Sequence, residues 1–158
     1  MDKAIKVGVG FGLTSATITT LGLIIGLDAG TGSKLAVAAG ILTIAVADSF
    51  SDALGVHIAK ESEGNFSEKE VWQATIYTFL CKFFFALTFL IPVLLLKENL
   101  AMMVAIAWGL LMLVILNYQV AKASGQKPLS VIFEHVFIAI LVIILSRGAG
   151  LLIGSWLT

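Results

Sequence analysis

Residues 35–59 read LAVAAGILTIAVADSFSDALGVHIA, an apolar stretch interrupted by Asp48 and Asp52. At a rise of about 1.5 Å per residue, a helix of this length crosses the roughly 30 Å hydrocarbon core of a bilayer. The stretch therefore predicts a membrane-spanning helix that carries two acidic side chains at lipid depth.

The rest of the chain has the same apolar character. Of its 158 residues, 59% are hydrophobic and 13% are charged, whereas soluble domains are about half apolar and a quarter charged. Short loops leave no room for a second domain, so we expect an all-α integral membrane protein with residues 1–158 forming a single transmembrane domain. Its five predicted spans are residues 7–27, 35–59, 71–96, 101–121 and 131–157.

The distribution of lysine predicts the orientation, because basic residues are retained on the cytoplasmic side. With the N-terminus inside, the inner segments hold more basic residues than the outer ones, which favours an N-in, C-out topology. A prokaryotic plasma membrane is the default expectation. The formal net charge of zero gives no reason to expect a nucleic-acid partner. The inner group is Lys3, Lys6, Lys60, Lys69, Lys122 and Lys127, and the outer group is Lys34, Lys97 and Arg147.

Small residues form one stripe along the first predicted span. Such a stripe lets another helix approach closely, because helix association in lipid depends on packing rather than on hydrophobic exclusion. The partner is either another span of the same chain or the first helix of a second copy, which would form a homodimer through the first helix. The stripe consists of Gly8, Gly12, Ser15, Thr19, Gly22 and Gly26.

The two aspartates of the second span are four residues apart, so they lie within about 40° of each other on one helix face. Each ionised aspartate at the centre of a membrane helix costs about 2.5 to 3.5 kcal/mol on insertion. This face is therefore expected to meet protein, water or a cation. Paired carboxylates can bind a divalent metal ion and can take up protons. The alternative is an ion pair with Lys82, in the middle of the third span.

Further polar residues are predicted near the inner membrane surface. His57 and Glu61 end the second span four residues apart, and Glu134 opens the fifth span. These residue types ligate divalent metals, although a solvated helix end is the better explanation for the first two. The predicted metal ligands are thus Asp48, Asp52, His57, Glu61 and Glu134.

Three segments resemble the vacuolar iron transporter (VIT) family: FGLTSATITTLGL (residues 11–23), SDALGVHIAKES (51–62) and GLLIGSWL (150–157). The resemblance covers the five-span layout. It implies a homodimer in which the first two helices of each subunit line a path for Fe²⁺ or a related divalent ion such as Mn²⁺, exchanged for protons, with no permanently bound cofactor. The loop at residues 64–67 is too short for the cytosolic metal-binding domain of some relatives.

The chain departs from the pattern of that family at several positions. Carried over one by one, the family's first-helix aspartate falls on Phe11, its second-helix methionine on Asp52, and its glutamate and tyrosine on Val56 and His57. These positions therefore differ from the family's pattern. The chain lacks the family's acidic residue on the first helix but has an additional one, Asp52, on the second. Asp52 is compatible with a replacement for the lost acid, and Asp48 is a further acid on the same helix.

Two other classes of function remain open. The chain could be a structural or assembly subunit whose aspartates only fix helix packing through Lys82. An intramembrane enzyme is the third class, and we do not expect one, because the sequence offers no nucleophile and base on neighbouring helix faces.

Overall fold

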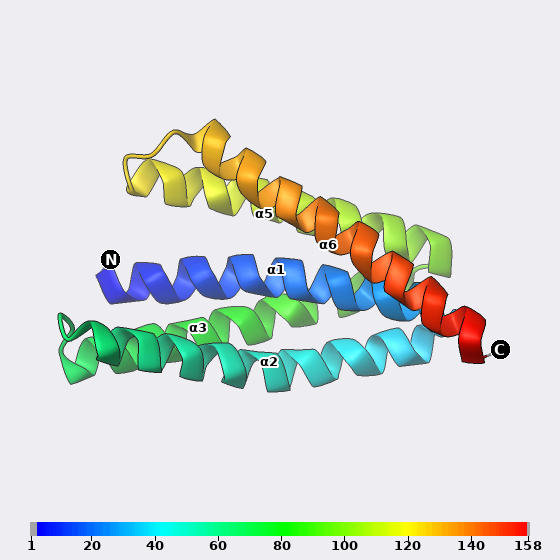
Figure 1. Cartoon of the computed structure of the whole chain (residues 1–158), viewed down its shortest axis with the longest axis horizontal. Coiled ribbons are helices and arrows are strands. Elements are labelled where there is room, and N and C mark those ends of the chain that lie inside the picture. The colour runs from blue at the N-terminus through cyan, green and yellow to red at the C-terminus, as the bar shows by residue number, and fades with distance from the viewer. Residues whose placement is uncertain (1–2, 158) are drawn as a thin grey trace.

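The computed structural model describes residues 3–157, apart from the side chain of residue 98, and these residues form α-helices joined by short loops (Figure 1). Five spans are long and apolar enough to cross a membrane, which confirms the predicted number. Most helices extend several residues beyond the predicted apolar segments. The helices are α1 (Lys3–Thr31), α2 (Lys34–Glu63), α3 (Glu68–Thr88), α4 (Leu90–Leu95), α5 (Glu98–Ala123) and α6 (Pro128–Leu157).

The loop between α2 and α3 forms as its sequence predicts. Gly64 ends α2 with a φ of 65°, a left-handed conformation that glycine adopts without a steric penalty. Ser67 and Glu70 then form a capping box at the start of α3, in which each side chain bonds the backbone of the other residue. These local signals turn the chain back between the second and third spans.

The third span is not one continuous helix. α3 ends at Thr88 and α4 begins at Leu90, so the third span, Glu68–Leu95, has a short break within it that the sequence analysis did not include. Pro92 lacks a backbone N–H, and its ring would clash with the carbonyl group of Thr88, four residues earlier. At this break, the Thr88 hydroxyl accepts a hydrogen bond of 3.0 Å from Trp108 Nε1, which connects the end of α3 to α5.

α1 lies at the centre of the bundle (Figure 1), with the α2–α3 hairpin on one side and the α5–α6 hairpin on the other. It is the most buried span, whereas α6 is the least buried. An apolar helix with so much exposed surface is suited to lipid rather than to water.

The glycine stripe of α1 packs within the same chain. A Cβ atom added at Gly8 would lie 2.5 Å from the Ala74 carbonyl oxygen of α3, and one added at Gly22 would lie 2.7 Å from Val142 of α6. The first half of the stripe thus allows α3 to approach, and the second half allows α6 to approach. Of the two partners that the sequence left open, spans of the same chain occupy these positions.

Candidate functional site

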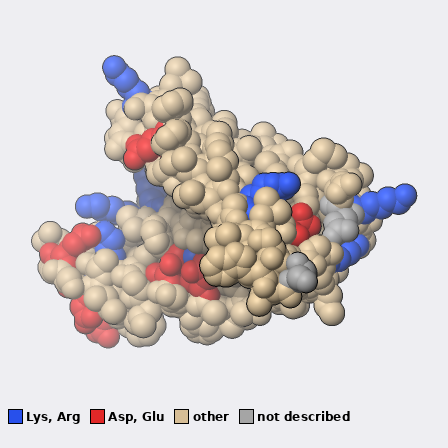
Figure 2. Space-filling model, turned by 45° about the vertical axis from the view of Figure 1, so that its right-hand side comes forward, with Lys and Arg blue, Asp and Glu red and all other residues tan. Residues whose placement is uncertain are grey.

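The second helix places its two aspartates at the edge of its buried face. That face consists of small and β-branched side chains, among them Ala45, Ser49 and Ala53, which pack toward the other helices. The Asp48 and Asp52 side chains are 25% and 21% exposed, so each carboxylate lies partly at the surface. Figure 2 shows acidic side-chain atoms on one face near the middle of the molecule, away from its ends.

The third helix brings a lysine to the same place. Lys82 follows Ala74 and Thr78 at intervals of four residues on the buried face of α3, so helical periodicity points it inward. Lys82 is only 1% exposed, which is rare for a lysine. A buried ammonium group needs hydrogen-bond acceptors or negative charges beside it.

Both aspartates pair with this lysine. Lys82 Nζ lies 2.5 Å from Asp48 Oδ2 and also forms an ion pair and hydrogen bond with Asp52 Oδ2. Its third contact is a hydrogen bond of 2.9 Å to the hydroxyl oxygen of Ser15 on α1. An ammonium group has three N–H donors, and here it has three oxygen neighbours. We call Ser15, Asp48, Asp52 and Lys82 the charged cluster.

The two carboxylates are held differently. Asp52 Oδ2 accepts hydrogen bonds from both Lys82 and the Ser15 hydroxyl, the latter at 2.6 Å. Asp48 Oδ2 reaches the ammonium group as an ion pair without hydrogen-bond geometry. Asp48 is therefore the less constrained of the two acids.

The charge of the cluster does not balance when every group is ionised, because two carboxylates share one ammonium. The excess is one negative charge at the depth where an isolated charge is most unfavourable. A proton, a cation or a second positive group would restore neutrality. The cluster is thus able to take up positive charge.

The difference between the two acids leads to a prediction about stability. Asp52→Asn is expected to lower the free energy of unfolding by about 1.5 to 3 kcal/mol, because it weakens two hydrogen bonds that end on a charged group. Asp48→Asn is expected to change it by less than about 1 kcal/mol, because it removes an ion pair but also the excess charge. Thermal unfolding of both variants in the same detergent measures the difference. A loss at Asp48 as large as that at Asp52 would contradict this ranking.

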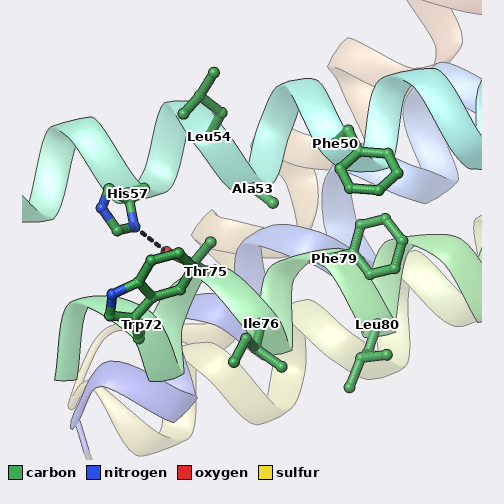
Figure 3. Close-up of a pocket in the computed structure, with 9 residues that line it drawn as sticks. All are labelled: Phe50, Ala53, Leu54, His57, Trp72, Thr75, Ile76, Phe79 and Leu80. Atoms are coloured by element: carbon green, nitrogen blue, oxygen red, sulfur yellow. Dashed lines mark hydrogen bonds between the residues drawn. The ribbon is translucent and has the colours of Figure 1, made fainter. Parts of the chain in front are cut away.

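The other predicted metal ligands do not join the cluster. His57 Nδ1 lies 2.9 Å from the Thr75 hydroxyl, and its ring meets the edge of Trp72, in a cavity of about 380 Å³ between α2 and α3 (Figure 3). Glu61 and Glu134 are exposed near the end of α2 and the start of α6. Among the side chains that the structure describes, no three His, Cys, Asp or Glu gather in a way that could hold a metal ion. The five predicted ligands therefore lie at separate places, with only Asp48 and Asp52 together.

Ser15 is the member of the cluster that the sequence did not single out for this role. It belongs to the small-residue stripe of α1, and this was the only signal that placed it on an inward face. Gly12, three residues earlier, explains why the short side chain of Ser15 contacts Lys82 on α3. A Cβ atom there would lie 2.8 Å from the Thr78 carbonyl oxygen, so glycine lets α1 and α3 approach beside Lys82.

Comparisons with protein-family models, with curated proteins and with solved structures find no match to this chain.

Proposed function

We propose that this protein transports a divalent metal ion across a membrane in exchange for protons, with Asp48 and Asp52 as the binding carboxylates. The observation that carries the proposal is the excess of one carboxylate over ammonium in a cluster at the middle of the membrane-spanning helices. Carboxylate and hydroxyl oxygens are suitable ligands for hard divalent ions. The resemblance to the VIT family supports the same class of cargo.

The charges of the cluster support an exchange of metal for protons. Two carboxylates share one ammonium group, so a divalent ion and a proton would compete for the same carboxylate oxygens. Asp48 Oδ2 has no hydrogen bond, so we assign Asp48 as the carboxylate that first exchanges a proton for the metal ion.

A homodimer fits the surface beside the cluster, along α2 rather than α1. Ala47, Ser51 and Gly55 are exposed at intervals of four residues next to the two aspartates. Small residues at this spacing allow close helix contact in lipid. A second copy packed there would also cover carboxylates that are otherwise costly to expose to hydrocarbon. The lysine-rich end that holds the N-terminus would face the cytoplasm.

Uptake of Mn²⁺ into proteoliposomes, with a pH dye inside the vesicles, tests the transport function. The wild-type protein is expected to move protons outward as metal ions are taken up. Asp48→Asn/Asp52→Asn should lose at least about tenfold in rate, since even outer-shell partners matter on this scale at metal sites. Glu63→Gln, on the same helix but outside the cluster and outside the predicted ligand set, is the matched control and should retain activity.

Transport by the double aspartate variant at the wild-type rate would refute the assigned site. Uptake without proton movement would remove the exchange mechanism and leave metal transport in place.

A second candidate function is a structural or assembly subunit, and the complete set of contacts around Lys82 favours it. All three N–H donors of this lysine have oxygen neighbours within the chain. Under this alternative the wild-type protein would move no metal ion, and substitutions in the cluster would alter only folding and assembly.

A further inference from the structure

A cavity of about 660 Å³ opens at the end of the bundle that holds the N-terminus. It lies between the first half of α1, the end of α5 and the start of α6, where the α5–α6 hairpin diverges from α1 (Figure 1). In the space-filling view the molecule is hollowed between its two parts at this end, with basic side chains close to the hollow (Figure 2). The cavity is separate from the charged cluster, because the lining residues include none of its members.

The lining of this cavity is positive at one end and apolar at the other. Lys3 and Lys6, in the first turn and a half of α1, lie with Gln126 at the end near the predicted membrane surface. Phe11 and Leu116 lie deeper along the spans. No acidic residue lines the cavity, so a cation would be repelled there and an anion attracted.

The Lys6 ammonium group has no ion pair or hydrogen bond to any residue that the structure describes. Lys3 is partly engaged toward the α2–α3 loop, because its Nζ lies 5.4 Å from the centroid of the Phe66 ring and its charge acts on the Glu70 carboxylate. At least one positive charge at the entrance of the cavity is thus available to a ligand.

We propose that this cavity binds one acidic phospholipid of the surrounding leaflet. The phosphate would lie against Lys3 and Lys6, at the level where α1 and α6 begin and lipid head groups are found. An acyl chain would cover the apolar lining deeper in the cavity, beside Phe11 and Leu116. A hydrated inorganic anion would satisfy the lysines but would leave that apolar surface uncovered, so the shape and charge together favour a lipid.

Titration with phosphatidylglycerol and with phosphatidylcholine of the same acyl chains, followed by native mass spectrometry in detergent, tests this site. The wild-type protein is expected to prefer the anionic lipid. One lysine beside an anionic head group strengthens binding about fivefold. Lys6→Gln should therefore weaken phosphatidylglycerol binding about fivefold, and Lys3→Gln/Lys6→Gln roughly 25-fold. Binding of phosphatidylcholine should change little.

Lys69→Gln is the matched control, because Lys69 is exposed at the same end of the bundle but does not line the cavity. Leu116→Trp, which narrows the apolar part and keeps both lysines, should also weaken lipid binding. Equal losses in Lys69→Gln and Lys6→Gln would show general surface attraction and overturn the site. Displacement of the lipid by inorganic phosphate, with phosphate binding fully retained in Leu116→Trp, would assign the cavity to a free anion instead.

Discussion

Replacement of Lys82 by methionine is expected to lower the free energy of unfolding by about 3 to 5 kcal/mol, because it leaves two neighbouring carboxylates without their counter-charge. Methionine is similar to lysine in length, so the loss arises from charge more than from packing. The lysine is 1% exposed, and solvent cannot replace its contacts. Thermal unfolding in detergent, followed by circular dichroism, measures the change.

Removing all the charges of the cluster separates electrostatics from packing. The triple variant Asp48→Asn/Asp52→Asn/Lys82→Met has no buried charge left to compensate, so it is expected to regain most of the stability lost by Lys82→Met. Lys69→Met is the control for loss of an exposed lysine and should be close to wild type. A triple variant as unstable as Lys82→Met would show that the ion pairs are not the source of the effect.

Substitution of Gly150 by alanine is expected to lower the free energy of unfolding by about 1 to 3 kcal/mol or more. The added Cβ atom would overlap the Gly26 carbonyl oxygen of α1 and would lie 3.0 Å from the backbone nitrogen of Gly30. Both neighbours are backbone atoms, so α6 would have to move away from α1. The melting temperature in detergent reports the loss.

Gly148, on the same helix, provides a matched control. A Cβ atom at Gly148 has nothing within 4 Å, so Gly148→Ala should meet no obstacle. In a helix interior this change is favourable by up to about 1 kcal/mol, which makes the two alanine substitutions opposite in sign. Equal effects of the two would contradict a close glycine contact between α1 and α6.

Much of the fold could be predicted from the sequence, because its signals are local. The length of each apolar run fixed the five spans, and Gly64 with the Ser67–Glu70 capping box fixed one of the turns. Helical periodicity alone also placed Asp48 and Asp52 on one face. The break near Thr88 was missed, although Pro92 carried a local signal for it.

The arrangement around the aspartates was decided by the tertiary structure. Spacing along one helix fixes the direction of a side chain but not the helix that it faces. Lys82 was a candidate partner from its position in the third span, yet only the packing of α1, α2 and α3 shows that it contacts both acids and Ser15. His57 and Glu134 followed the same local rules and were placed elsewhere. The sequence alone determined which segments are long and apolar enough to cross a membrane and which side chains share a helix face, since both depend on local chain geometry. The charged cluster exists only because glycines such as Gly12 let three helices approach at one level, and that contact between distant segments is a property of the folded chain.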